Sequence, residues 1–302
     1  MNYLVKESPL VSVIIPVFNG EKYIEQSMKS VENQTYRFVE LIVVNDGSTD
    51  ETESKILNFI SKSNLHVKLL TTVNQGASHA KNLGLRSSEG QLIAFLDADD
   101  LWLPNKLEKQ VSLLLMNKDA IGVGCGYLKF LDNSTRRTKV LNFFWQQKSI
   151  SAWALLEGPG PGFNSTILLK RNVLDKLGGF DEMIGVMADD LDLVMRLHPL
   201  GKILQETNCL VELRVWNGQN YRNLPDMEKA LLRLYMKHFQ QSQYHLDLAL
   251  SNLNVWIGIR LIFQGKVLDG LEKIVKGILK SPLRAGRLPW KFFVKSISGR
   301  WG

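Results

Sequence analysis

Strand-like segments alternate with helical patterns through the first third of the chain, and this alternation constrains the fold more than any other feature. Four segments have the length and bulk of strands: Val11–Ile15, Phe38–Val44, His66–Thr71 and Leu92–Leu96. Helical spacing fills the three intervals between them, over residues 21–33, 51–62 and 77–86. Such alternation builds βαβ units, whose strands pair in parallel. We therefore predict an α/β protein with a Rossmann-like, mostly parallel sheet flanked by helices.

Polar clusters follow three of these strands. They are Pro16–Asn19, the turn-rich run Asn45–Asp50 and the acidic run Asp97–Asp100. The carboxyl ends of parallel strands meet at one edge of a sheet, and ligands bind beyond that edge. We expect the three clusters to converge there in a single site.

The acidic run reads Asp97-Ala98-Asp99-Asp100. Its carboxylates repel one another unless a cation or hydrogen-bond donors compensate their charge. Oxygen-rich clusters of this kind suit Mg²⁺ or Mn²⁺, which also hold substrate phosphates. The alternative is a solvated acidic turn that caps the helix beginning near Pro104. The run alone leaves both interpretations open.

The rest of the chain completes a large domain and adds a helical region. We expect strands at 121–131, 163–169, 203–204 and 209–215, with helices at 104–117, 171–177 and from 189. The glycine-proline segment Gly158–Gly162 is either a lid over the site or a plain connector. From about Leu224 the pattern is almost wholly helical. We place a boundary near Gly218, between a sheet domain at 1–218 and a helical region at 219–302.

The net charge of +7 comes from the C-terminal end. Eight of the 37 basic residues lie from Lys273 onward, where no acidic residue occurs, which leaves 29 basic and 30 acidic residues elsewhere. This near-neutral body argues against binding of nucleic acid. Apolar residues, including Trp290 and Phe292, separate the basic ones, as in helices that lie in a membrane interface. We expect this basic amphipathic tail to contact a membrane surface; the alternative is a helical cap packed on the domain.

Cysteine content and hydropathy indicate the compartment. Cys125 and Cys209 form neither a disulfide framework nor a ligand cluster, which points to a reducing environment. Residues 1–8 do not resemble a signal peptide, and the longest apolar span, Leu253–Phe263, is too short to cross a bilayer. We expect a cytoplasmic protein that is peripheral on the cytoplasmic face of the membrane.

Five ordered motifs stand between residues 9 and 220. They are VSVIIPVFN from Val11, LIVVNDGSTD from Leu41, NQGASHAKNLGL from Asn74, FLDADD from Phe95, and LGGFDE from Leu177 with DDLDLVMR from Asp189. In this order and spacing they resemble the family 2 inverting glycosyltransferases, which have the GT-A nucleotide-sugar-binding fold. The resemblance implies a nucleotide-binding half at about 1–103 and an acceptor half at about 104–218.

The activity implied by the resemblance is transfer of a sugar, with inversion, from a UDP-, GDP- or dTDP-linked donor to an acceptor hydroxyl. The acceptor would be a saccharide or lipid-linked saccharide in cell-surface polysaccharide synthesis, and Mn²⁺ or Mg²⁺ would be the cofactor. Two alternatives are a metal-dependent nucleotidyltransferase and a non-catalytic, nucleotide-binding membrane scaffold. The first lacks a glycine-rich triphosphate loop after Ile15.

Donor-binding residues also follow from the resemblance. Pro16, Val17 and Asn19 would border the nucleobase, Asp46 would accept a hydrogen bond from it, and Asp97 would reach the ribose. In the third motif a lysine replaces the more usual arginine. The full donor set is Pro16, Val17, Asn19, Asp46, Gly76, Lys81 and Asp97.

The implied catalytic groups are carboxylates. Asp99 would hold the metal, and Asp190 stands at the family's position for the general base, beside Asp189 where glutamate is usual. Burial or a like-charged neighbour raises the pKa of a carboxylate into the range that a base needs. Trp216 stands where many members carry a metal-binding histidine, and it is either core or a stacking surface for a sugar.

Overall fold

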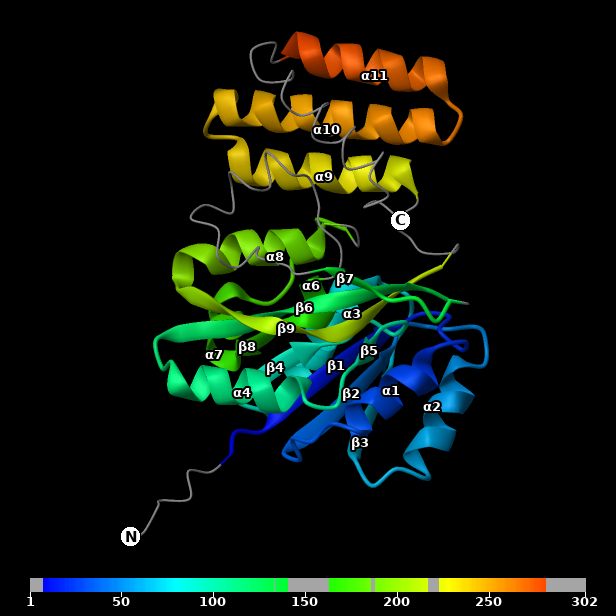
Figure 1. The fold of residues 1–302 in the computed structure, drawn as a ribbon, viewed down its shortest axis with the longest axis vertical. Coiled ribbons are helices and arrows are strands. Elements are labelled where there is room, and N and C mark those ends of the chain that lie inside the picture. Colours follow the sequence, from blue (N-terminus) through cyan, green and yellow to red (C-terminus); the bar gives the residue numbers. More distant parts are fainter. Residues whose placement is uncertain (1–7, 133, 141–162, 186–187, 217–222, 281–302) are drawn as a thin grey trace. The chain divides into compact units, whose positions relative to one another are not determined.

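The computed structural model describes residues 8–132, 134–140, 163–185, 188–216 and 223–280 (Figure 1). These residues form two compact units, one ending at residue 216 and one beginning at residue 223. The predicted boundary near Gly218, the loop Gly158–Gly162 and the tail after Lys280 lie outside the described residues. The domain limits therefore stay a prediction.

The first half of the sheet follows the predicted alternation. Its strands are β1 (Val11–Val17), β2 (Val39–Asn45), β3 (His66–Thr71) and β4 (Leu92–Phe95). The helices between them are α1 (Ile24–Glu32), α2 (Thr52–Ile60) and α3 (Ala77–Ser87). The strands lie in the order β3-β2-β1-β4 and pair in parallel throughout. The carboxyl ends of β1, β2 and β4 thus open on one edge, as predicted.

The second half of the chain extends this sheet to nine strands, with β8, β6, β9 and β5 following β4 in that order. The strands are β5 (Leu101–Trp102), β6 (Ala120–Leu131), β7 (Thr138–Val140), β8 (Leu168–Lys170) and β9 (Lys202–Val215). The helices are α4 (Lys106–Met116), α6 (Phe163–Thr166), α7 (Arg171–Leu177), α8 (Asp189–Leu197) and the short η2 (His198–Leu200). The long pair β6 and β9 is parallel, and β8 runs antiparallel to both of its neighbours.

Three details differ from the predicted elements. Residues 163–169 were expected as one strand, but α6 occupies the first four and only β8 is extended, because Ser165 and Thr166 are buried and bonded within the site region. The strands predicted at 203–204 and 209–215 are one continuous strand, β9. The polar residues 205–208 stay within this strand because its register with β6 shifts around Gly124–Gly126. β5 and β7 are two and three residues long, too short to show a period.

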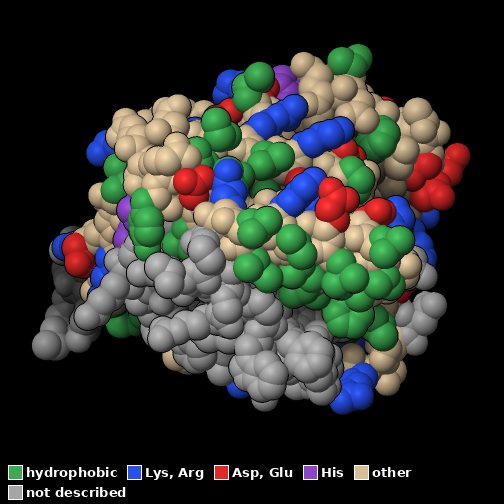
Figure 2. All heavy atoms as spheres, turned by 90° about the horizontal axis from the view of Figure 1, so that it is seen from above, with side chains coloured by type: hydrophobic (Ala, Val, Ile, Leu, Met, Phe, Trp, Pro, Cys, Tyr) green, Lys and Arg blue, Asp and Glu red, His purple; other side chains and the backbone are tan. Residues whose placement is uncertain are grey.

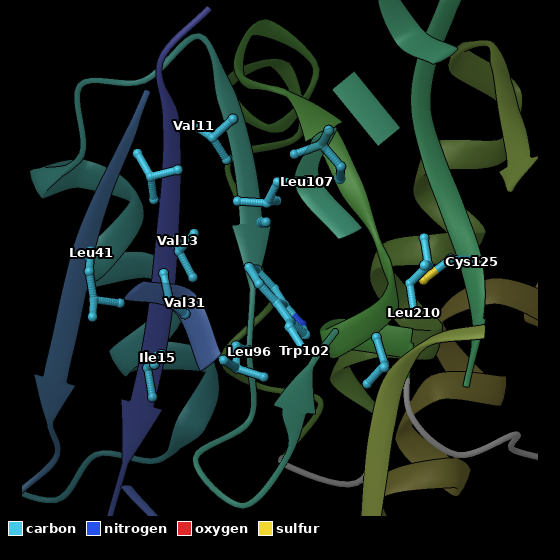
Figure 3. Close-up of a cluster of buried hydrophobic side chains, with 14 of the residues drawn as sticks. Val11, Val13, Ile15, Val31, Leu41, Leu96, Trp102, Leu107, Cys125 and Leu210 are labelled. Carbon is cyan, nitrogen blue, oxygen red and sulfur yellow. The ribbon is translucent and has the colours of Figure 1, made fainter. Parts of the chain in front are cut away.

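β1 is buried on both faces, which explains its continuous apolar sequence. Its odd-numbered residues Val11, Val13 and Ile15 share one cluster with side chains of α1, α2 and α4, and Trp102 lies in the same cluster (Figure 3). Ile14 faces the opposite way, toward α3, where a Cβ atom added at Gly84 would stand 2.5 Å from its Cγ2 atom. α3 therefore approaches the sheet closely enough to bring its first turn to the carboxyl edge.

The second unit consists of α9 (Leu224–Phe239), α10 (Gln243–Phe263) and α11 (Val267–Lys280), side by side in Figure 1. The predicted apolar span at 253–263 is only the second half of α10, which has 21 residues. Among the described residues, α10 is the one helix long and apolar enough to cross a membrane. It also fits a core helix, since 56% of its apolar window is buried.

We predict that Gly84→Ala destabilises the protein, although alanine favours a helix over glycine by about 1 kcal/mol. The added methyl group would overlap Ile14, and such overpacking costs about 1–3 kcal/mol. Urea unfolding measures the difference. Arg86→Ala, on the exposed side of the same helix, is the control and should stay within about 0.5 kcal/mol of the wild type. Equal or greater stability of Gly84→Ala would refute the close approach of α3 and β1.

Candidate active site

The loops after β1 and β2 are bonded to each other at the carboxyl edge. The Asn19 backbone N–H donates to Ser48 Oγ (2.9 Å), and the Thr49 N–H donates to Asn19 Oδ1 (2.8 Å). The Gly20 N–H donates to Thr52 Oγ1 (2.8 Å). Asn19 has a positive φ of 50°, a conformation that asparagine tolerates better than most residues. Pro16 and Val17 end β1 beside this junction, so the three predicted base-bordering residues lie together.

Asp46 joins the second cluster to the start of α3. Its Oδ1 atom accepts from the Gln75 N–H (2.9 Å) and its Oδ2 atom accepts from the Gly76 N–H (2.8 Å). Gly47 permits the close approach, because a Cβ atom there would lie 2.8 Å from the Asn74 nitrogen. Asp46 thus holds the predicted donor-binding residue Gly76 in place. Each of its oxygens has a second lone pair with which to accept from a nucleobase.

The three carboxylates of the acidic run have three different environments. Asp100 is buried, accepts from Ser165 Oγ (2.6 Å) and from the Arg214 N–H (3.1 Å), and does not cap α4. Burial, with Asp99 and Asp97 nearby, raises the pKa of Asp100 well above its usual range. The alternative of a solvated helix-capping turn is therefore wrong for Asp100, which belongs to the protein interior.

Asp99 is held at both its backbone and its side chain. Trp216 Nε1 donates to Asp99 Oδ2 (2.8 Å), and Arg214 Nε donates to the Asp99 carbonyl oxygen (2.9 Å). The Trp216 ring packs on Tyr23 with a centroid separation of 5.5 Å. Trp216 is therefore half-buried at the N-terminal end of α1. It also donates a hydrogen bond to the predicted metal ligand, a role that is neither core packing nor sugar stacking.

Arg214 organises this corner of the site, and the sequence analysis missed it. Its backbone N–H donates to Asp100, and its guanidinium donates to the Asp99 carbonyl. The guanidinium also donates to Asp132 Oδ1 (2.8 Å) and to Gln26 Oε1 (2.8 Å). Asp132 also accepts from Lys22 (2.6 Å), and hydrogen bonds from its neighbours lower the pKa of Asp132 to about 2. The available signal was a charged residue between Leu213 and Val215 at the end of β9.

Asp189 and Asp190 begin α8 and differ sharply in their partners. Asp189 is buried and its Oδ2 atom accepts from Lys81 Nζ (2.7 Å) and Ser78 Oγ (3.2 Å). Asp190 accepts only a local bond from the Leu191 N–H (2.7 Å) among those found in the described residues. Burial, and then repulsion from Asp189, raises the pKa of Asp190 to about 7. Of the two, Asp190 has the character of a base.

Lys81 lies between the acidic groups of the two halves. Burial lowers the pKa of Lys81, but Asp189 and Asp97 outweigh burial, so that its pKa lies above the ordinary value. Burial conversely raises the pKa of Asp97 to about 6, against the opposing effect of Lys81. The structure thus brings together Asp97, Lys81, Asp189 and Asp190. The charge of Lys81 is paired with Asp189 inside the protein, and the sequence did not predict this ion pair.

The segment before α8 is docked on α3 through Asn82. The Phe180 N–H donates to Asn82 Oδ1 (2.8 Å), and Asn82 Nδ2 donates to the Phe180 carbonyl (2.9 Å) and to Glu182 (2.8 Å). The Phe180 ring also lies 4.7 Å from Lys81 Nζ and edge-on to Phe95 of β4. These contacts fix the predicted acceptor-side motif against the donor-side helix.

A metal at this site would depend on few protein ligands. The described residues contain no group of three or more His, Cys, Asp or Glu side chains placed to hold an ion. Mg²⁺ is commonly held by one or two carboxylates, with phosphates and water completing its shell. Asp99 fits an ion of this kind. A metal that takes all of its ligands from protein side chains would not fit the described residues.

We predict that Arg214→Ala destabilises the protein by about 3 kcal/mol, because a buried guanidinium is lost together with its bonds to the Asp99 carbonyl, Asp132 and Gln26. Thermal and urea unfolding measure the loss. Arg137→Ala is the control, because Arg137 pairs with Glu212 near the surface and such pairs contribute about 1 kcal/mol or less. Similar losses in the two variants would show that Arg214 does not organise the acidic run.

Sequence comparison agrees with the motifs. Residues 12–178 match the model of glycosyl transferase family 2. The Escherichia coli UDP-Glc:α-D-GlcNAc-diphosphoundecaprenol β-1,3-glucosyltransferase WfgD is 38% identical over 167 residues, which are 55% of this chain and 62% of WfgD. An uncharacterized glycosyltransferase of Rickettsia prowazekii is 34% identical over 218 residues, which are 70% of this chain and 66% of that protein. The chain thus spans less than two thirds of the length of these relatives.

Solved structures agree on the fold. S. aureus TarS in complex with UDP-GlcNAc aligns with a TM-score of 0.61 at 16% identity, over 92% of each chain. A mannosyltransferase from Pyrobaculum calidifontis in complex with GDP-Man and Mn²⁺ aligns with a TM-score of 0.63 at 20% identity, over 97% of this chain and 81% of that one. The predicted GT-A-type architecture is confirmed, and the chain belongs to glycosyl transferase family 2.

Proposed function

We propose that the protein is an inverting glycosyltransferase that moves a sugar from a nucleotide-diphosphate sugar to an acceptor hydroxyl. The observation that carries the proposal is the pairing of a pinned carboxylate, Asp189, with an adjacent carboxylate, Asp190, whose pKa is raised to about 7. A base of this kind can take a proton from a hydroxyl near neutral pH. Asp97 and Asp99 belong to the same carboxyl edge and supply the donor side.

Each part of the site has a role in this reaction. The junction around Asn19 and the oxygens of Asp46 would receive the nucleobase, and Asp97 would receive the ribose. Asp99 would hold Mn²⁺ or Mg²⁺, which when bound offsets the charge that develops on the diphosphate leaving group. Asp190 would accept the proton as the hydroxyl attacks the anomeric carbon. Attack from the face opposite the leaving group, in one displacement, inverts that carbon.

The donor and acceptor are proposed only by class. The relatives and structural neighbours use or bind UDP-linked and GDP-linked sugars, so UDP, GDP and dTDP donors all stay candidates. WfgD acts on a sugar linked to diphosphoundecaprenol, which supports a lipid-linked or free saccharide acceptor in cell-surface polysaccharide synthesis. Such an acceptor suits a protein on the cytoplasmic face of the membrane.

We expect Asp190→Asn to lower kcat by about 10²–10⁴-fold, the usual contribution of a positioned general base. Transfer is measured by release of the nucleoside diphosphate. Donor binding should persist, since Asp190 lies on the acceptor side. Asp175→Asn, an isosteric change at an exposed position of α7, is the control and should leave kcat unchanged. Undiminished transfer by Asp190→Asn would remove Asp190 from the mechanism, and donor binding without any transfer by the wild type would favour the scaffold alternative.

The rate should also depend on pH in a defined direction. Asp190 must be ionised to accept a proton, and its raised pKa of about 7 means that acid removes the active form. We expect kcat to be level above pH 8 and to fall about tenfold per unit below pH 6. A pH–rate profile of the wild-type protein checks this. A profile that is flat from pH 5 to pH 8 would exclude a base with this pKa.

Metal use is tested through donor binding rather than turnover. Donor at about 100 times its Kd should stabilise the wild-type protein by roughly 2.7 kcal/mol. We expect Mn²⁺ to enhance the thermal shift produced by the correct donor and Asp99→Asn to abolish that enhancement. Asp119→Asn, an exposed aspartate after α4, serves as the control. The same screen over UDP-, GDP- and dTDP-sugars would identify the nucleotide.

A further inference from the structure

α11 packs closely on α10 at glycines, and Ile274 of α11 with Val255 and Ile262 of α10 fill the space beside them. A Cβ atom added at Gly270 would lie 2.6 Å from the Gly258 carbonyl oxygen, and one at Gly277 would lie 2.7 Å from the Ser251 carbonyl oxygen. Ser251 Oγ donates to the Gly277 carbonyl oxygen (2.6 Å). Gly270 and Gly277 are the buried residues of α11. The two helix backbones are therefore nearly in contact, and α11 has one fixed rotation about its axis.

Ion pairs hold α11 in the same orientation. Lys273 pairs with Glu228 of α9, and Lys280 pairs with Asp247 of α10 at 3.3 Å. A water-exposed helix normally turns its apolar side to the core and its charges outward. In α11 charged side chains reach back to the other helices of the unit, so its apolar side must face elsewhere.

The apolar residues of α11 recur at three- and four-residue spacing and form one exposed face. Leu268 is 82% exposed and Leu279 is 75% exposed, values that are high for leucine in any folded unit. Figure 2, which looks onto α11, shows hydrophobic side chains gathered in one patch beside lysines and arginines. We call this the α11 apolar face, and its residues are Val267, Leu268, Leu271, Val275, Ile278 and Leu279.

We propose that the α11 apolar face docks on an anionic lipid surface. An apolar face opposite a charged face, followed by a basic segment, is the composition of helices that lie in a membrane interface. The charge of the sequence that follows α11 selects this occupant over a second copy of the chain. The lysines of α11 itself are paired with Glu228, Glu272 and Asp247, but the charged residues after Lys280 are all basic: Arg284, Arg287, Lys291, Lys295 and Arg300. Two such regions would repel each other, whereas anionic lipids attract each basic residue near the surface.

The proposal goes beyond the proposed function and draws support from it at one point, because a lipid-linked acceptor would lie in such a surface. Docking itself needs no nucleotide, metal or acceptor. Vesicle binding can therefore fail while sugar transfer succeeds, and the reverse.

The test is flotation of the full-length protein with vesicles of phosphatidylcholine, with and without 30% phosphatidylglycerol. The variant combines Leu268→Gln, Val275→Gln and Leu279→Gln, all at exposed positions of α11. Its matched control combines Leu57→Gln, Leu115→Gln and Met116→Gln, which are exposed apolar positions of α2 and α4. Circular dichroism confirms that both variants are folded.

We expect the wild type and the control to bind anionic vesicles, and the α11 variant to bind them at least tenfold more weakly. We also expect neutral vesicles to bind the wild type at least tenfold more weakly than anionic ones. Equal binding of the α11 variant and the wild type would overturn the proposal and would indicate that the C-terminal tail binds lipid or covers this face. A dimer of the wild type in sedimentation that the α11 variant lacks, without vesicle binding, would assign the face to a second copy.

Discussion

The ion pair between Lys81 and Asp189 is the interaction on which the candidate site depends. It joins α3, which belongs to the parallel half of the sheet, to α8, which follows the antiparallel strand β8. Both groups are almost fully removed from water, and a buried charge is tolerable only when paired and hydrogen-bonded. The pair also influences the pKa values of the neighbouring carboxylates Asp97 and Asp190. Lys81 fixes Asp189 next to Asp190, and burial, together with repulsion from Asp189, raises the pKa of Asp190 to about 7.

A second network fixes the acidic run from the other side. Arg214, near the end of β9, donates to the backbone of Asp99 and to the side chain of Asp100, so the strand most distant in sequence holds the loop after β4. The parallel pairing of β9 with β6 delivers Arg214 to this point. Lys81 thus places a basic group beside Asp189, and Arg214 places one beside the Asp99 carbonyl.

The fold was predictable from sequence where local and long-range requirements agree. β1, β2 and the helices beside them carry clear periods, and their order along the chain dictates parallel pairing. Asn19, Asp46 and Asp99 each follow a predicted strand and Asp190 begins a predicted helix, so their places in the fold were predictable; their roles come from the family resemblance and stay predictions. The Lys81–Asp189 bond, the Arg214 network and the Trp216–Asp99 bond were not, because each joins segments more than a hundred residues apart and no local pattern specifies such a contact. The short helix α6 was missed because the strand-like sequence of residues 167–169 follows it directly, and it is the long-range bonds of Ser165 with Asp97 and Asp100 that distinguish the segment before.

The indole of Trp216 has a consequence for the choice of cation. Its N–H group takes one of the two lone pairs of Asp99 Oδ2 and neither of those of Oδ1, so Oδ1 is the better placed of the two to bind an ion. Calcium often takes both oxygens of a carboxylate and six to eight ligands in all, whereas magnesium binds through single oxygens in a tight octahedron. We therefore expect a cation to bind Asp99 mainly through Oδ1, a geometry that suits magnesium better than calcium. A tryptophan, which itself coordinates no metal, would in this way take part in ion selection.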